Sequence, residues 1–550
     1  MGDEFSILIK NGIVIDGGKH DGSALNVGIK AGKITAVQPE LEVRAERVID
    51  ARGLIVAPGF IDMHSHSDFF SPLVKSADSF VRQGITTTVV GMCGSSLAPI
   101  HPEKREEFID MMVKSDPHLK DVKFNWNTFR EYLDAMNRIP NAINMAYVVG
   151  YESLRIAGGS GFENRTPTNL EIETMRNLLT EAMKAGAFGV STGLIYAPQV
   201  YAETKELVEI SKALSSFDGL YFSHIRGEGA TVFDAIDEVK TIVMESRCRG
   251  GHISHHKIAD KKMWGQSTRS LKLIHEINKS GVSLTYDSYP YERGCSSLIT
   301  ALPTWTREGG TEKALERLKN TSTRERIMTE VTDDINTDPT AIWENWIKTD
   351  GFDNIFISSV ESERWKYAIS LSIAEIAEKE EGFDTWDVFF NILLDDNGAT
   401  MITMKSMDEK DVKHVMTSEY QMFGTDGVAI SSAFGYGIDH PRSFGTYPRV
   451  LGKYVRDEGV LTLTDAIRKM TSLPANRLGL QNRGRINEGM WADIVIFDPE
   501  TIIDVATYEK PDQFPVGIQY VLVNGEIVVE GATQHPVYPG KVLRHKVVNY

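Results

Sequence analysis

Cysteine is scarce in this sequence, and long apolar runs are absent. The 550 residues include three cysteines, Cys93, Cys248 and Cys295, which are too few for the disulfide framework of a secreted protein. No run of about eighteen apolar residues occurs, so we expect no membrane-spanning helix and no membrane partner. The N-terminal residues lack the basic and apolar segments of a signal peptide. Together these absences predict a cytoplasmic protein.

Positive charge is also in deficit. The chain carries 59 Lys and Arg against 76 Asp and Glu, a formal net charge of −17. Nucleic-acid binding depends on neutralising phosphates with basic side chains, so this balance argues against such a partner. For an anionic substrate, basic residues inside the pocket must overcome the repulsive field of the whole protein.

The two ends of the chain predict a shared domain. Residues 5–16, 25–37, 47–55, 493–497 and 520–529 are interpreted as short strands, and Asn524 and Gly525 form a dipeptide that favours a hairpin turn in the last of them. The length exceeds one ordinary domain. We therefore predict a small β-sandwich domain built from residues 1–61 and 484–550.

The centre, residues 62–483, alternates strand-like runs with helical patterns. The runs interpreted as strands cover residues 85–90, 143–149, 188–192, 220–223, 251–254, 282–286 and 420–424. This alternation predicts an α/β fold with a (β/α)8 TIM-like barrel and active-site groups at the carboxyl ends of the strands. Residues 290–353 break the rhythm and are rich in charge, so we expect an insertion after the seventh strand. Its Trp305 and Trp343 leave open whether it is a lid or a structural excursion.

Candidate metal ligands stand at the ends of these runs. His64 and His66 are two positions apart, and on a strand they would face the same side. Cys93 lies between glycines in the run GMCG, residues 91–94, which lets the backbone bring its sulfur close to a cation. His224 and His255 each close a later strand. Imidazole and thiolate together favour zinc.

Asp426 is a carboxylate at the end of a further strand. It is placed to take a proton from water and pass it to a leaving amine. Taken singly, a histidine is more often a packing residue than a ligand, and Cys93 is more often a small buried hydrophobe. The joint placement at successive strand ends favours a metallohydrolase.

The chain resembles the amidohydrolase superfamily, and within it the N-acyl-D-amino-acid deacylases, or D-aminoacylases. The likeness covers nearly the whole length. The motifs that carry it are PGFIDMHSHSD (58–68), GMCG (91–94), STGLIYAP (191–198), SHHK (254–257), DSYPY (287–291), HPRSFGTYPR (440–449), RGRI (483–486) and ADIVIF (492–497).

This resemblance implies a metal site and a substrate site. It implies one zinc held tightly by Cys93, His224 and His255, and a weaker second site reached by His64 and His66. It makes Asp426 the general acid and base.

It also assigns the contacts of the substrate carboxylate to Tyr196, Lys257 and Arg442, two of which are cations that answer the charge constraint. Arg293 should border the side-chain pocket, where it either selects an acidic substrate or pairs with Glu292 at the surface.

The chain departs from many members of the superfamily at two places. The fourth predicted strand contains no lysine to bridge two metals, so a bridge from Cys93 is the simplest substitute. Tyr151 stands after Gly150, where many relatives have histidine. A role of that histidine near the metal is therefore not expected here.

The implied reaction is zinc-dependent hydrolysis of N-acyl-D-amino acids, small molecules, to a D-amino acid and a carboxylate. The alternatives are a cyclic-amide hydrolase of the dihydroorotase or hydantoinase kind, and an inactive relative that serves as a scaffold. The missing lysine and the cations Lys257 and Arg442 weigh against the first, and the retained ligands weigh against the second. The oligomeric state is left open.

Overall fold

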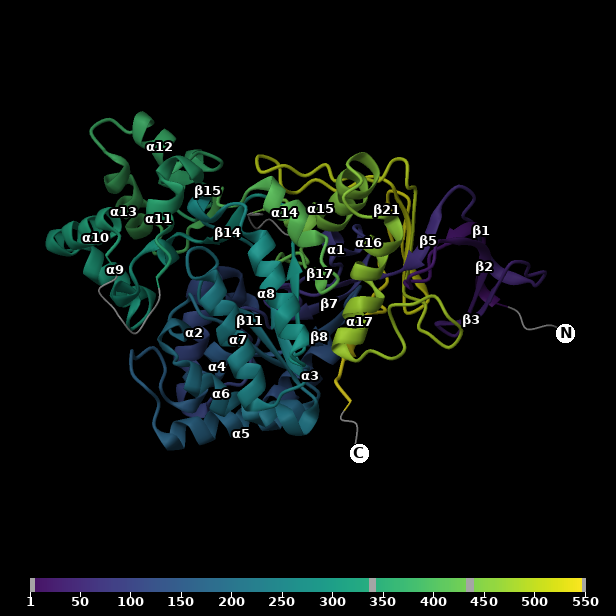
Figure 1. The fold of residues 1–550 in the computed structure, drawn as a ribbon, viewed down its shortest axis with the longest axis horizontal. Coiled ribbons are helices and arrows are strands. Elements are labelled where there is room, and N and C mark those ends of the chain that lie inside the picture. The colour runs from purple at the N-terminus through teal and green to yellow at the C-terminus, as the bar shows by residue number, and fades with distance from the viewer. Residues whose placement is uncertain (1–4, 336–342, 432–439, 547–550) are drawn as a thin grey trace.

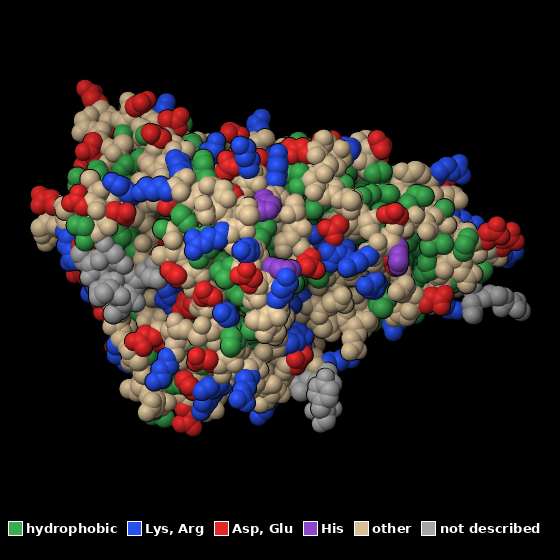
Figure 2. All heavy atoms as spheres, in the orientation of Figure 1, with side chains coloured by type: hydrophobic (Ala, Val, Ile, Leu, Met, Phe, Trp, Pro, Cys, Tyr) green, Lys and Arg blue, Asp and Glu red, His purple; other side chains and the backbone are tan. Residues whose placement is uncertain are grey.

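A computed structural model describes residues 5–335, 343–431 and 440–546 and shows an α/β fold. Figure 1 shows three parts along the longest axis: a sheet from the two chain ends, a central set of parallel strands with helices around them, and a helical insertion at the opposite end. In the part of the chain that the structure describes, no helix combines the length and apolar character needed to cross a bilayer. Acidic and basic side chains are interspersed over the face drawn in Figure 2.

Strands from both chain ends pair in one sheet. They are β1 (Phe5–Val14), β2 (Ser23–Lys30), β3 (Lys33–Gln38), β4 (Ala45–Asp50), β5 (Ile55–Pro58), β18 (Ile494–Phe497), β19 (Ile518–Val523), β20 (Glu526–Glu530) and β21 (Thr533–Gln534). β5 joins the two ends because it pairs parallel with β1 and antiparallel with β18. The predicted turn between β19 and β20 has positive φ at both Asn524 and Gly525, as the dipeptide favours.

The central strands are parallel and nearly all buried. They are β6 (Phe60–Asp62), β7 (Ile85–Val90), β8 (Asn144–Tyr147), β9 (Val149–Gly150), β10 (Gly189–Gly193), β11 (Leu220–His224), β12 (Gly250–Ile253), β13 (Leu284–Ser288) and β17 (Gln421–Phe423). β6, β7 and β8 pair in that order, and β9 to β13 followed by β17 pair in theirs. The N–H of Met63 donates to the carbonyl of Phe423 at 3.2 Å, so the first and last strands lie side by side.

Helices connect these strands and cover them (Figure 1). They are α1 (Asp78–Val81), α2 (Arg105–Ser115), α3 (Phe129–Arg138), α4 (Tyr151–Gly158), α5 (Asn169–Ala185), α6 (Thr204–Ser211), α7 (Val232–Ser246), α8 (Ser267–Lys279), α14 (Glu409–Met416), α15 (Arg442–Arg449), α16 (Leu463–Met470) and α17 (Ser472–Leu478). α5 shows how the sequence sets such boundaries. Thr168 and Glu171 form a capping box at its start, and Gly186 ends it with φ 110°.

The insertion between β13 and β17 is a small subdomain with its own apolar core. Its antiparallel sheet has the order β14 (Gly294–Ser297), β16 (Met401–Met404), β15 (Ile355–Ser359). Its helices are α9 (Thr311–Leu318), α10 (Thr321–Asp333), α11 (Trp346–Asp350), α12 (Ile373–Lys379) and α13 (Thr385–Asp395). Trp305 and Trp343 pack against this core. The insertion was predicted to end at residue 353, but it extends at least to Met404, because β16 is the central strand of its small sheet.

The last strand, β22 (Val542–Leu543), pairs in parallel with β8 and not with the sheet of the chain ends. The C-terminal segment therefore contributes to both sheets. The predicted domain boundaries remain predictions.

Candidate active site

His64 and His66 follow the carboxyl end of β6, as predicted. The Asp62 carboxylate fixes this turn by accepting the backbone N–H of His64 at 3.3 Å and that of Thr425 at 2.8 Å. The side chain of His64 is fully buried, whereas that of His66 is 27% exposed. The two imidazoles therefore differ in their access to solvent.

The turn that carries Cys93 depends on glycine. Gly91, Cys93 and Gly94 all have positive φ, at 81°, 51° and 80°. A Cβ at Gly91 would lie 2.1 Å from the carbonyl oxygen of Val148, so no other residue fits there without movement of the backbone. This tight turn brings the sulfur to the carboxyl end of the parallel strands.

Cys93 Sγ lies among three imidazoles. It is 3.3 Å from His64 Nε2, 3.5 Å from His255 Nε2 and 3.7 Å from His224 Nδ1. Burial raises the pKa of the Cys93 thiol, but the charges of His64 and His255 outweigh it, so its pKa lies well below the usual range. The site therefore favours a thiolate.

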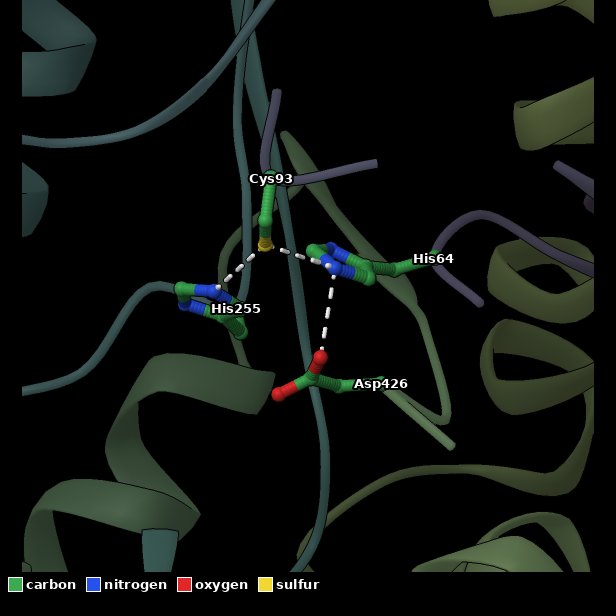
Figure 3. A group of neighbouring side chains, drawn as sticks. All are labelled: His64, Cys93, His255 and Asp426. Atoms are coloured by element: carbon green, nitrogen blue, oxygen red, sulfur yellow. Dashed lines mark hydrogen bonds and ion pairs between the residues drawn. The ribbon is translucent and has the colours of Figure 1, made fainter. Parts of the chain in front are cut away.

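Asp426 faces the same cluster from the strand end after β17 (Figure 3). Its Oδ1 lies 3.2 Å from Nε2 of His64 and 3.2 Å from Nε2 of His66. Its Oδ2 accepts a hydrogen bond from Arg442 at 2.7 Å. Burial raises the pKa of Asp426, but the positive charges of Arg442 and the histidines lower it by more, so its pKa lies well below the usual range.

These donors fit a metal ion. Donor atoms of His64, Cys93, His255 and Asp426 all lie within 4.8 Å of one another, and all four residues are buried. Bonds of about 2.3 Å to sulfur and about 2.1 Å to nitrogen would place the ligands of a tetrahedral zinc roughly 3.5 Å apart. The three sulfur–nitrogen distances match that spacing. Sulfur and imidazole donors favour zinc over the hard cations Mg²⁺ and Ca²⁺.

Two carboxylates that we did not predict hold the histidines from behind. Asp287 Oδ2 lies 3.4 Å from His64 Nδ1 and 3.0 Å from His252 Nε2. Glu228 Oε1 lies 2.9 Å from His255 Nδ1. Asp287 stands in the DSYPY motif near the end of a predicted strand, which was an available signal. Glu228 lies four residues after the predicted ligand His224, and this spacing is a weaker signal.

The predicted substrate contacts line one cavity of about 1020 Å³, which is also lined by four predicted metal ligands, His66, Cys93, His224 and His255. Tyr196, Lys257 and Arg442 line it together with Cys93 and Asp426. The Tyr196 ring packs edge-on against His224, with ring centroids 5.1 Å apart. The volume lies at the upper end of the range for ligand-binding pockets.

Arg293 lies beside this cavity, next to Gly294, which lines it. Its guanidinium stacks between Phe356 and Tyr508, at 3.9 and 4.2 Å from the ring centroids. In the described segments it forms no ion pair with Glu292, so the surface pairing that we considered is not present there.

The two departures from the superfamily have structural explanations. The buried hydroxyl of Tyr151 donates to Glu206 and lies 3.1 Å from Arg155 NH1, so it belongs to a buried polar network. At the end of β10, a Cβ on Gly193 would lie 2.2 Å from the carbonyl oxygen of Cys93. A side chain at Gly193 would therefore require the backbone to move.

Comparison with known proteins shows relatives that match this chain over nearly its whole length. The model of the amidohydrolase family matches residues 47–288 and 421–529. D-aminoacylase from Alcaligenes xylosoxydans xylosoxydans is 32% identical over 542 residues, which cover 98% of this chain and 97% of that protein. N-acyl-D-glutamate deacylase from the same organism is 33% identical over 545 residues, covering 99% and 97%.

A solved structure extends the likeness to the fold. N-acyl-D-glutamate deacylase from Bordetella bronchiseptica, in complex with zinc and a phosphonate inhibitor, has a TM-score of 0.81 at 30% identity, covering 98% of this chain and 100% of that chain. The break between the two family matches falls where the insertion separates β13 from β17. Sequence, fold and the cluster of buried donors agree, and the chain belongs to the amidohydrolase family.

Proposed function

We propose that this chain is a zinc-dependent enzyme that hydrolyses the amide bond of N-acyl-D-amino acids. The products are a free D-amino acid and a carboxylate. The observation that carries the proposal is one cavity that contains both the Cys93, His255 and Asp426 cluster and the cations Lys257 and Arg442. The D-configuration rests on likeness to relatives named for D-amino acid substrates.

The architecture that we propose is a (β/α)8 barrel closed between β17 and β6, with a small β-sandwich from both chain ends. The order of the parallel strands and the hydrogen bond between Met63 and Phe423 support closure. In a closed barrel the predicted metal ligands, which follow or end β6, β7, β11 and β12, meet at one end.

We assign one tight zinc to Cys93, His224 and His255 and a weaker second metal to His64 and His66. The contacts of Cys93 Sγ with His224 and His255 support the first assignment. Zinc in this site would supply a Lewis acid that polarises the amide carbonyl and promotes attack by water at neutral pH. Cys93 Sγ is the atom within reach of both histidine sets, so it is our choice for a bridging ligand.

Asp426 would move the proton. As a carboxylate it accepts a proton from the attacking water and returns it to the amine nitrogen as the C–N bond breaks. Arg442 keeps Asp426 ionised and oriented before substrate binds.

Tyr196, Lys257 and Arg442 would bind the substrate carboxylate. Lys257 Nζ now lies 2.6 Å from Glu228, and Arg442 bonds Asp426, so the bound carboxylate would share these cations with protein acids. A forked guanidinium and an ammonium in one pocket offset the negative field of the chain.

The test is amine release by the purified zinc-loaded protein from N-acetyl-D- and N-acetyl-L-amino acids, with hydantoin and dihydroorotate in parallel. We expect release from D-substrates alone. Ring opening of a cyclic amide without release from acyl-amino acids would replace the proposal with the cyclic-amide alternative.

A further inference from the structure

Glu228 lies behind two of the three imidazoles that face Cys93 Sγ, those of His224 and His255. His255 points Nε2 toward the sulfur and Nδ1 toward Glu228 Oε1, at 2.9 Å. His224 points Nδ1 toward the sulfur and Nε2 toward Glu228 Oε2, at 3.9 Å. At 2.9 Å the Glu228 carboxylate is within hydrogen-bond distance of the outer nitrogen of His255, which fixes that ring and its tautomer so that the inner nitrogen offers a lone pair. At 3.9 Å its effect on His224 is that of a nearby charge and not of a hydrogen bond.

The same carboxylate holds the substrate cation. Lys257 Nζ donates to Glu228 Oε1 at 2.6 Å and also lies 2.7 Å from His255 Nδ1. Glu228 is 7% exposed, so water competes little for these contacts. One buried side chain thus contacts two predicted zinc ligands and one predicted carboxylate contact.

The insertion holds the loop that carries Glu228. Glu344, just before α11, accepts the backbone N–H groups of Glu228 and Gly229 with one carboxylate oxygen, at 2.5 and 2.7 Å. Two residues further, Trp346 lines the cavity. A subdomain that is remote in sequence therefore fixes the backbone of the shared carboxylate.

We propose that Glu228 is a positioning residue shared by the zinc ligands and the substrate-carboxylate contact, and that Glu344 of the insertion holds it in place. The substrate part rests on the proposed function. The metal part does not, because zinc affinity can be measured without any substrate.

The experiment compares full-length Glu228→Gln, Glu344→Ala and Glu344→Gln with the wild type. The matched control is Glu325→Ala, an exposed glutamate of the same insertion, on α10. Zinc affinity is measured by competition with a chromophoric chelator, KM and kcat with the best D-substrate, and folding by thermal melting.

Glu228→Gln should weaken zinc binding by about 10- to 100-fold and raise KM more than it lowers kcat, because it removes the charge behind His255 and Lys257. Glu344→Ala should change both quantities in the same direction by a smaller factor. Glu344→Gln should restore them, because its amide oxygen still accepts the two N–H groups. The control should match the wild type.

Wild-type zinc affinity in Glu228→Gln would overturn the proposal, as would complete loss of zinc, which would make Glu228 a ligand. Wild-type behaviour of Glu344→Ala would remove Glu344 from it. If Glu228→Gln does not fold, Glu344→Ala with rescue by Glu344→Gln decides the outcome. If no acyl-amino acid is hydrolysed, the proposed function fails while the zinc affinities still test the positioning role.

Discussion

Asp426 combines a buried carboxylate with three cationic or polar neighbours. Its oxygens lie 3.2 Å from His64 and His66 and 2.7 Å from Arg442. Such a carboxylate stays ionised when buried, as a proton acceptor must.

We expect Asp426→Asn to lower kcat by about 10²- to 10⁴-fold, because the amide cannot shuttle the proton. The tight zinc should remain, since Cys93, His224 and His255 are intact. Steady-state kinetics and metal analysis of the same preparation check both statements. Near-normal turnover would remove Asp426 from the mechanism, and loss of zinc would make it a ligand.

Our prediction for Arg293 is that it contacts the side chain of an acidic substrate. Its guanidinium is stacked on Phe356 and Tyr508 next to the cavity. A charged hydrogen bond contributes about 1.5–3 kcal/mol, which is roughly 10- to 100-fold in kcat/KM.

Arg293→Met should therefore lower kcat/KM for N-acetyl-D-glutamate or N-acetyl-D-aspartate by that factor. N-acetyl-D-methionine is the internal control, and its kcat/KM should stay near the wild-type value. An equal loss for acidic and neutral substrates would show that Arg293 supports the pocket structurally and does not read the side chain.

At the scale of elements, α11 carries an unfavourable buried acid. Asp350, its last residue, is 3% exposed, and neither carboxylate oxygen has a hydrogen-bond partner among the described residues. Burial raises the pKa of Asp350 from 3.8 to about 7; the charge of Lys261 opposes this shift, and those of Asp260 and Glu344 add to it.

The sign of the resulting pH dependence follows from proton binding. Between pH 4 and 7, approximately, the folded protein holds a proton on Asp350 that the unfolded chain has lost, so stability falls as pH rises through this window. Above pH 7 the free energy of unfolding is lowered by the full amount, of the order of 4 kcal/mol at most.

Asp350→Asn should raise the melting temperature at pH 8 and leave it nearly unchanged at pH 4. Equal melting temperatures at pH 8 would contradict the shift.

For the whole molecule, the metal site joins segments that are distant in sequence. The predicted tight ligands follow or end β7, β11 and β12, and the second pair follows β6. An ion that binds only the folded chain stabilises it by mass action, by about 4 kcal/mol when free zinc is 1,000 times the dissociation constant.

We therefore expect the zinc-loaded protein to melt at a higher temperature than protein treated with a chelator. Cys93→Ala should abolish most of that difference, since it removes the sulfur that faces all three histidines. Differential scanning calorimetry with and without zinc measures the effect. A melting temperature that zinc does not change would exclude a preformed tight site.

Local sequence determined many of the strands and pointed to the predicted metal ligands. The strand-like run at residues 85–90 is β7, and the turn at Asn524 and Gly525 forms because the φ preference of a dipeptide is a short-range property. Cys93 was recognisable because its flanking glycines permit the turn that it needs. The family likeness supplied the roles of these residues.

Tertiary structure alone decided which side chains lie behind the ligands. Asp287 and Glu228 contact histidines that come from other strands, and Tyr151 contacts Glu206, 55 residues away in the chain. The small sheet extends to Met404 because β16 pairs with two strands that precede it. These contacts depend on how strands line up after the chain has folded, and neither periodicity nor motif spacing encodes that alignment.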